Sequence, residues 1–246
     1  MKFIEKPNLP NSRVVAAAIN ANAVAAIDKL HCLGIKTIKI PDNPNLPEPV
    51  AAHADLQLLH MGNSVVFSQN EHLFQGSQSK NLCFRHIGAQ LGNEYPKDVL
   101  LNCAVIGNKL ICNKKTIAGE VLEFAETNGL TVINVNQGYA KCSICVVNQE
   151  AIITDDESIF AAAGNFFNDT LFISKGSIVL KGYNYGFIGG CCGKIDKNKM
   201  AFNGAIESHK DYKKILDFLA RNNIQCIELH SERLNDIGGI LPLYEE

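Results

Sequence analysis

The chain has 246 residues, 46% of them hydrophobic, with 23 basic and 25 acidic residues and a formal net charge of −2. Such a chain lacks the positive field that attracts phosphate backbones or anionic lipid, so neither nucleic acid nor a membrane is an expected partner. Residues 1–12 hold no apolar core of signal-peptide length, and no later stretch approaches the ~20 apolar residues of a membrane span. We therefore expect a globular protein of the cytoplasm.

The N-terminal part of the sequence has the pattern of two strands joined by a helix. The predicted elements are a strand at 13–19, a helix at 21–33 and a strand at 35–40. Asn20 is the expected helix cap, and Gly34 supplies the left-handed conformation that ends the helix.

A strand–strand–helix–strand order is clearest from Leu100 onward. Gly107 and Asn108 indicate a two-residue hairpin turn, Thr116 indicates a helix cap, and Gly129 indicates the end of that helix. The predicted elements are strands at 100–106, 109–112 and 130–135 and a helix at 116–128.

The same order recurs before and after this unit. An upstream copy has strands at 56–61, 65–67 and 82–85, with a weaker helix near residue 71. Two downstream copies have strands at 143–147, 151–154 and 171–174 with a helix at 156–164, then strands at 200–202 and 224–229 with a helix at 211–222. Such self-similarity is typical of repeat architectures, so we predict one α/β domain over residues 1–246 made of about five units.

The N-terminal unit lacks a first strand, and the C-terminus supplies a candidate for it. Residues 238–244 have no hairpin partner of their own, and we expect them to pair beside residues 14–19. This pairing would complete the N-terminal unit, cover its edge and close the units into a ring. An ordinary mixed α/β sheet is the alternative.

A closed ring of five ββαβ units resembles the pentein superfamily of five-bladed β/α-propellers. That superfamily includes dimethylarginine hydrolases, arginine and agmatine deiminases, amidinotransferases and a ribosome anti-association factor. The segment from Gln137 to Cys145 is similar to the stretch that holds the catalytic histidine of the guanidine enzymes. Gly238 and Gly239 are similar to the glycine pair before their nucleophilic cysteine, and Asp55 is similar to their substrate-binding acid.

Both catalytic positions of the pentein enzymes are altered in this chain. Tyr139 stands where the resemblance implies a histidine, and Leu241 or Pro242 stands where it implies the cysteine. Guanidine chemistry needs a thiolate to attack the guanidinium carbon and a histidine to carry protons. The resemblance therefore predicts a pentein-like fold without the standard guanidine-modifying catalysis.

Counting back equally from each hairpin places Asp55, Lys141, Gly190 and Gly239 around one opening of the ring. With Tyr139, these residues are the predicted ligand-binding set, because a carboxylate, an ammonium and free backbone N–H groups suit a small zwitterionic or guanidino ligand. An ion pair between Asp55 and Lys141 that only stabilises the fold is the alternative.

The stretch from Gly186 to Gly193 is the richest in glycine. It lacks the ending of a phosphate loop and the spacing of a dinucleotide motif, so no cofactor is expected. It either brings backbone close to a ligand or forms a tight corner that needs positive φ. Cys191 is then a candidate thiol at the mouth of the channel.

The nine cysteines are expected to be free thiols, because no export signal precedes them. Cys142 and Cys145 have C-x-x-C spacing, but residues three apart on a strand point to opposite faces, which argues against a shared metal. Cys142 beside Lys141 remains a candidate activated thiolate, which makes Cys142 and Cys191 the two candidate nucleophiles.

His53, His60 and Asp55 form the only local group of histidines with an acid. On an extended strand His53 and Asp55 would share a face, which makes them weak candidates for metal binding or for a general base.

Three functions follow from these patterns. The first is a pentein-like protein that binds a small polar, amino-acid- or guanidine-like ligand in its channel without the standard catalysis. The second is a divergent hydrolase or amidinotransferase that uses Cys142 or Cys191. The third is a ring that binds another protein. The sequence predicts no oligomeric state.

Overall fold

The computed structural model describes residues 1–70 and 82–246, and within them the strands form five small sheets. The helix expected near residue 71 lies outside the described residues. The strands are β1 (Lys2–Phe3), β2 (Val14–Asn20), β3 (Lys36–Ile40), β4 (Leu58–Gly62), β5 (Val65–Ser68), β6 (Cys83–Arg85), β7 (Ala104–Ile106), β8 (Lys109–Cys112), β9 (Thr131–Asn134), β10 (Ile144–Asn148), β11 (Ala151–Thr154), β12 (Asp169–Phe172), β13 (Cys192–Asp196), β14 (Lys199–Phe202), β15 (Gln225–Glu228) and β16 (Leu241–Glu245). The α-helices are α1 (Val24–Cys32), α2 (Ala54–Gln57), α3 (Gly119–Thr127), α4 (Glu157–Ala163) and α5 (Tyr212–Arg221).

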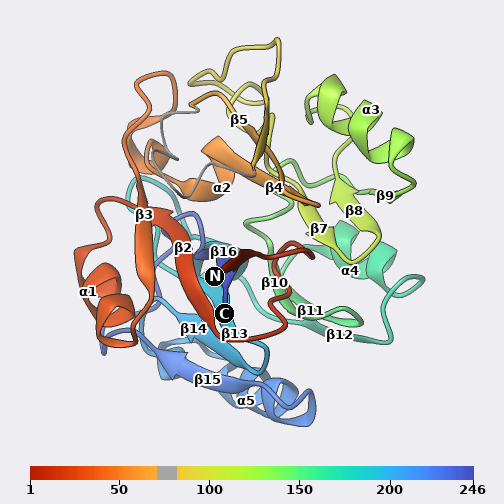
Figure 1. Ribbon diagram of the computed structural model, residues 1–246. Coiled ribbons are helices and arrows are strands. Elements are labelled where there is room, and N and C mark those ends of the chain that lie inside the picture. Colours follow the sequence, from red (N-terminus) through yellow and green to blue (C-terminus); the bar gives the residue numbers. More distant parts are fainter. Residues whose placement is uncertain (71–81) are drawn as a thin grey trace.

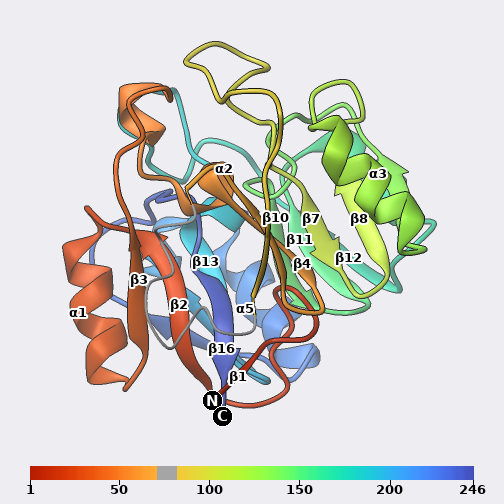
Figure 2. The ribbon, with the colours of Figure 1, turned by 45° about the horizontal axis from the view of Figure 1, so that its top comes forward.

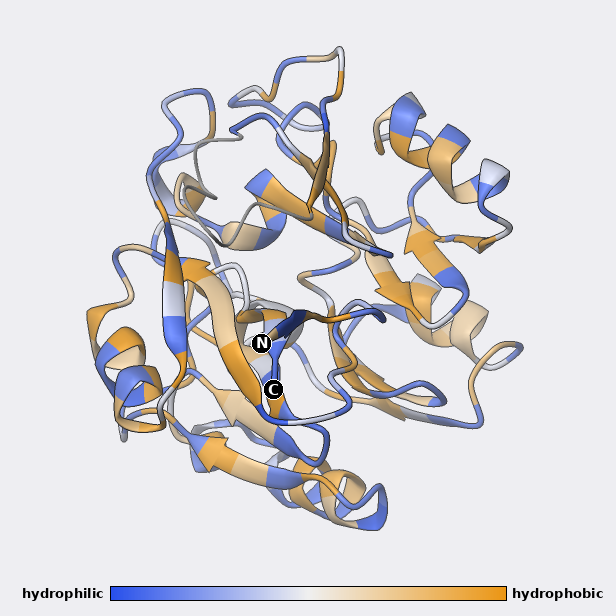
Figure 3. Cartoon of the chain, viewed as in Figure 1, coloured by the Kyte–Doolittle hydropathy of each residue, from blue (hydrophilic) through white to orange (hydrophobic). Residues whose placement is uncertain are grey.

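Four of the sheets share one arrangement, an antiparallel hairpin followed by a parallel third strand. They are β4-β5-β6, β7-β8-β9, β10-β11-β12 and β13-β14-β15. The sheets lie around a common centre in chain order, with α1, α3, α4 and α5 toward the outside (Figure 1). The strands carry most of the apolar residues and the connecting loops are largely polar (Figure 3).

The remaining sheet joins the two ends of the chain in the order β1-β16-β2-β3. Strand β16 pairs with β2, as the sequence predicts, and it runs antiparallel to β2 with Leu241 opposite Ala18. The short strand β1, which the sequence did not indicate, pairs with the other edge of β16. The N- and C-termini therefore lie side by side (Figure 2).

The helices pack apolar side chains against their own sheets. Helix α5 is the clearest case, because it buries Phe218 and Leu219 in one cluster with Phe202 of β14. In the N-terminal unit, Ile27 and Leu30 of α1 pack in a cluster with Ile19 of β2. Burying side chains of this size stabilises the fold by about 1.5–3 kcal/mol each.

Two helices begin later than predicted. Helix α1 starts at Val24, because the Asn20 side chain accepts the N–H of Asn22 in a turn instead of capping the helix. Helix α3 starts at Gly119, after a similar turn in which Asn113 accepts the N–H of Lys115. Asparagine forms such local turns readily, which shortens the helix that follows.

The expected extended conformation at residues 53–55 is wrong. Residues 54–57 form the single helical turn α2, and β4 begins only at Leu58. The preceding 3₁₀ turn at Glu48–Val50 and the hydrogen bond from Leu56 N–H to His53 O keep the chain turning through this region. His53 and Asp55 therefore do not share the face of a strand.

In the described part of the chain, every helix falls short of the length and apolar character needed to cross a bilayer.

Candidate functional site

The candidate site lies at the centre of the molecule, where the segments that precede β4, β7, β10, β13 and β16 meet. Each segment is hydrogen-bonded to the next, and the last is bonded to the first. The bonds join Asp55 N–H to Gly238 O (3.1 Å), Gly239 N–H to Gly190 O (2.8 Å), Gly190 N–H to Cys142 O (3.0 Å), Lys141 N–H to Asn102 Oδ1 (2.8 Å) and Asn102 Nδ2 to Asp55 O (3.2 Å). We call this set the central hydrogen-bond cycle.

Gly190 and Gly239 lie at the centre, but the cycle already uses the backbone N–H groups that the sequence predicted to be free for a ligand. The N–H of Gly190 donates to Cys142 O, and its carbonyl accepts from Ile237 and Gly239. A Cβ at Gly190 would lie 2.0 Å from Asp236 Oδ1, so the glycine is required by close packing. Gly190 does not have a positive φ, so backbone conformation does not require a glycine there. Gly239 does have a positive φ, of +80°.

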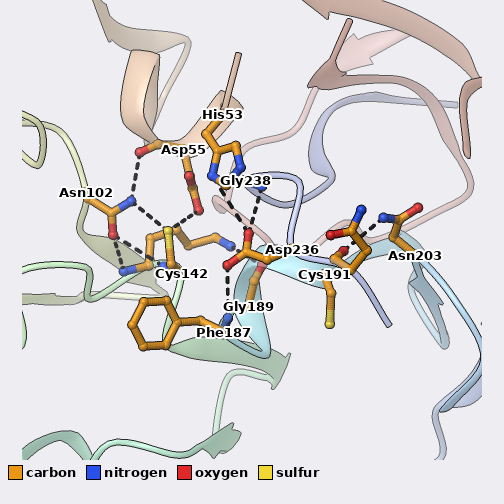
Figure 4. A network of polar contacts seen from close by, with 12 residues as sticks. His53, Asp55, Asn102, Cys142, Phe187, Gly189, Cys191, Asn203, Asp236 and Gly238 are labelled. Atoms are coloured by element: carbon orange, nitrogen blue, oxygen red, sulfur yellow. Dashed lines mark hydrogen bonds and ion pairs between the residues drawn. The ribbon is translucent and has the colours of Figure 1, made fainter. Parts of the chain in front are cut away.

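The side chains of Asp55 and Cys142 face each other (Figure 4). The Cys142 thiol donates to Asp55 Oδ2 at 2.9 Å, and both residues are buried. Burial raises the pKa of the Cys142 thiol well above its usual value, and the negative charges of Asp55 and Asp236 raise it further. The prediction of an activated Cys142 thiolate is therefore not supported by its surroundings.

Lys141 is buried beside Asp55 without pairing with it. Its Nζ donates to Gly189 O at 3.4 Å, and no carboxylate of a described residue lies within ion-pair distance. The ion pair with Asp55 that the sequence left open is therefore not formed. Both side chains line a small inner pocket of about 20 Å³ that Leu241 and Pro242 also border.

A larger cavity of about 220 Å³ includes Cys142 of the cycle in its lining, and we call it the main cavity. Four aromatic rings dominate its lining, together with one carboxylate, one imidazole and one thiol. Its residues are Val50, His53, Leu56, Tyr139, Cys142, Leu180, Tyr183, Asn184, Tyr185, Phe187 and Asp236. Apolar walls with a few polar groups are typical of small-molecule sites.

Asp236 is the buried carboxylate of this cavity. It accepts hydrogen bonds from the backbone N–H groups of Phe187 (2.9 Å) and Gly238 (3.0 Å). His53 Nδ1 lies 3.8 Å from Asp236 Oδ1 (Figure 4). Burial raises the pKa of the Asp236 carboxyl, and the charge of His53 opposes that shift.

Tyr139 lies in the wall of the main cavity, as its prediction as a ligand-binding residue requires. Its ring stacks on Phe187, with centroids 6.0 Å apart, and its hydroxyl donates to buried Asp98. Burial and the hydrogen bond to Asp98 raise the pKa of Tyr139, which keeps the phenol neutral.

The other cysteine candidate is wrong as a thiol at the channel mouth. Cys191 is fully buried in an apolar cluster with Ile188 and Leu234, and its thiol donates to Ile188 O at 3.2 Å. Burial raises the pKa of the Cys191 thiol well above its usual value. Cys145 of β10 lies in the same cluster, whereas Cys142 lies in the turn before β10 and not on the strand that the sequence predicted for both.

The metal candidates His53 and Asp55 contact different partners. His53 faces Asp236, whereas Asp55 faces Cys142. His60 stacks edge-on against Phe3, with ring centroids 4.4 Å apart. Within residues 1–70 and 82–246, no group of three or more histidine, cysteine or acidic residues is arranged to hold a metal ion.

A model of the family described as "Family of unknown function (DUF6873)" matches residues 17–241. The chain belongs to this family. A comparison of the DUF6873 chain with curated protein sequences finds no match.

Solved structures share the fold of this DUF6873 chain at low sequence identity. One is DDAH from Pseudomonas aeruginosa in complex with citrulline, with 12% identity, a TM-score of 0.57, and coverage of 95% of this chain and 100% of that chain. Another is inosamine-phosphate amidinotransferase from Streptomyces griseus, with 11% identity, a TM-score of 0.59, and coverage of 99% and 97%. A third is agmatine deiminase from C. jejuni, with 10% identity, a TM-score of 0.53, and coverage of 93% and 90%. The DUF6873 chain therefore has the fold of the pentein superfamily, a mixed α/β fold of small sheets with few helices.

The sequence did not indicate the cavity rings of Tyr183, Tyr185 and Phe187, nor two polar residues of the DUF6873 site. Asp236 was not a candidate, although the glycine pair that follows it at positions 238 and 239 marked the segment. Asn102 was read as part of a strand, whereas β7 begins at Ala104 and leaves the Asn102 amide free to bridge Asp55 and Cys142.

Proposed function

We propose that this DUF6873 protein binds a small cationic ligand of the guanidine or amino-acid-like class in the main cavity. The observation that carries the proposal is a cavity walled by the rings of Tyr139, Tyr183, Tyr185 and Phe187 with the buried carboxylate of Asp236 in its lining. Aromatic faces attract cations, and a carboxylate accepts hydrogen bonds from a guanidinium or ammonium group.

The balance of buried charge also favours a cation. The carboxyl groups of Asp55, Asp98 and Asp236 are all buried, and the buried Lys141, which lines a pocket with Asp55, forms no ion pair with a described carboxylate. Uncompensated buried negative charge is unfavourable, so a bound cation relieves it.

We propose binding without the reaction of the guanidine-modifying penteins. The similar structures carry names that refer to agmatine deimination and amidino transfer, and one holds citrulline. In this chain Tyr139, with a phenol kept neutral by burial, stands at the position of the histidine. The thiol that does line the main cavity is that of Cys142, and its raised pKa opposes nucleophilic attack.

The proposed site depends on five ββαβ units that form a closed ring in a single domain. The central hydrogen-bond cycle supports closure, because it links one segment from each unit and returns to the first. The pairing of β16 with β2 also supports closure, because this pairing joins the last segment of the chain to the first unit. Closure would hold Asp236 and His53, which come from opposite ends of the chain, at a fixed separation.

Calorimetric titration with agmatine and arginine tests the proposed function. We expect saturable binding at one site, weakened about 3- to 30-fold by Tyr183→Ala, because a cation–π contact contributes about 0.5–2 kcal/mol. Phe160→Ala is the matched control, since Phe160 is 40% exposed on α4 and Tyr183 is 43% exposed in the cavity lining. The proposal fails if neither compound binds, or if both variants weaken binding equally.

A further inference from the structure

A second hollow adjoins the main cavity and shares His53, Leu180 and Asp236 with it. Its volume is about 510 Å³. The lining differs in chemistry, since side-chain amides and an imidazole replace the aromatic rings. The polar residues that matter here are Asn20, Asn22, Asn203, His230 and Asn235. We call this space the asparagine–histidine hollow.

Several hydrogen-bonding groups of the hollow have no partner among the described residues. Asn203 is 3% exposed and holds His230, with 2.9 Å between Asn203 Oδ1 and His230 Nε2. The other ring nitrogen, His230 Nδ1, is buried without a hydrogen bond. The Asn235 carbonyl accepts from Asn203 Nδ2 at 2.9 Å, while no described residue hydrogen-bonds the Asn235 side-chain amide.

The chemistry of the hollow matches hydroxyl groups better than charged groups. An amide or a neutral imidazole offers both a donor and an acceptor, and a hydroxyl group is likewise donor and acceptor. The lining includes charged side chains of both signs, namely the positive Lys181 and the negative Glu48 and Glu232. Asp236, which lines both the main cavity and the hollow, adds a negative charge that disfavours a phosphate or carboxylate group beside it.

We infer that the ligand has two parts, a cationic head in the main cavity and a hydroxyl-rich body, such as a sugar or cyclitol ring, in the asparagine–histidine hollow. This inference rests on the proposed function for the head. The shared pair of His53 and Asp236 lies where the two parts join. A ligand filling both spaces places hydroxyl groups beside the side-chain amide of Asn235, which no described residue hydrogen-bonds.

The test compares two compounds with the same head. Ethylguanidine carries the head alone, and 2-guanidinoethyl β-D-glucoside carries the head with a sugar. We expect calorimetric titration to show the glucoside binding about 10-fold more tightly or better, because one or two net hydrogen bonds contribute about that factor. Asn235→Ala should weaken glucoside binding about 10-fold and leave ethylguanidine binding unchanged. His230→Ala removes a side chain that lines the hollow, so it should also weaken glucoside binding alone.

Asn165→Ala is the control, since Asn165 is exposed and lies outside the lining of both spaces. Equal affinity for the two compounds, or hollow variants that affect both compounds alike, would overturn the two-part ligand while the cationic head site stands. If neither compound binds, the proposed function itself fails. Two independent hollow variants keep the test decisive if one of them does not fold.

Discussion

The thiol of Cys142 donates a hydrogen bond to the carboxylate of Asp55 at 2.9 Å, although the two residues are 87 positions apart in the sequence. The Asn102 amide donates to the same sulfur at 3.2 Å. Asn102 lowers the pKa of the thiol, but burial and the charges of Asp55 and Asp236 raise it more. The cavity thiol is thus held in its neutral form, where it is a hydrogen-bond donor rather than a nucleophile.

We therefore predict that Cys142 and Cys191 resist alkylation in the native protein at neutral pH. Cys32 and Cys83 are exposed and serve as internal controls that should be modified first. Mass-spectrometric mapping after brief treatment with iodoacetamide measures the order of reaction. Modification of Cys142 or Cys191 ahead of the exposed pair would instead favour the divergent enzyme.

Binding of a cationic ligand should weaken as the pH falls. The ionised carboxylate of Asp236 attracts the cation, and burial raises the pKa of that carboxyl above its usual range. Protonation therefore removes the attraction at a higher pH than for an ordinary aspartate, whose pKa is about 3.9. Agmatine titrations at about pH 8 and about pH 5 measure the change. Asp236→Asn should bind weakly with little pH dependence, and a wild-type affinity that does not fall at the lower pH would contradict the role of Asp236.

Asp155 should make the fold less stable as the pH rises. Burial raises the pKa of this carboxyl from 3.8 to about 6, and its Oδ1 has no hydrogen bond. The folded state therefore holds a proton that the unfolded state releases between about pH 4 and 6, so stability is lost across this window as pH increases. Asp155→Asn should be more stable than wild type at about pH 7.5 by up to about 3 kcal/mol, and the difference should shrink at about pH 4.5.

Urea unfolding at the two pH values measures this difference for Asp155→Asn, with Asp217→Asn, at an exposed position of α5, as the control. An Asp155→Asn variant that is no more stable than wild type at the higher pH would show that the carboxylate is well solvated.

The closing strand β16 should be essential for folding. Leu243 is fully buried in a cluster with Leu58 and Val66, so Leu243→Ala is expected to destabilise the protein by about 2–5 kcal/mol. Val24→Ala, at a position 62% exposed on α1, should change stability by less than about 0.5 kcal/mol. A chain ending at Ile237 should aggregate or fail to fold, because β1 and β2 lose their shared partner. Soluble expression of that truncated chain with an unshifted melting curve would contradict closure through β16.

Local patterns in the sequence predicted the hairpin strands well. Strands β8 and β11 match the expected residues 109–112 and 151–154, since a turn signal and a short apolar run define both ends. Helix α4 lies within the expected 156–164, and the Asp156 side chain caps it by accepting from Ser158 and Ile159 N–H. The pairing of β16 with β2 was also predictable, because residues 238–244 had no other partner in the pattern.

Contacts between distant segments were not predictable in the same way. The pairing of His53 with Asp236 depends on a helical turn at 54–57 and on how the last loop packs, and neither leaves a periodic signal. Strand β1 has only two residues, too few to show alternation. The exclusion of Cys191 from the cavity follows from tertiary packing beside Ile188 and Leu234, which a glycine-rich stretch does not reveal.

The central claim is that the main cavity binds a cationic ligand and leaves it unchanged. Titration of the wild-type protein with agmatine, followed by mass spectrometry of the recovered ligand after prolonged incubation, tests both halves of the claim at once. We predict saturable binding at one site and recovery of unmodified agmatine. The absence of binding, or recovery of the ureido product with release of ammonia, would contradict it.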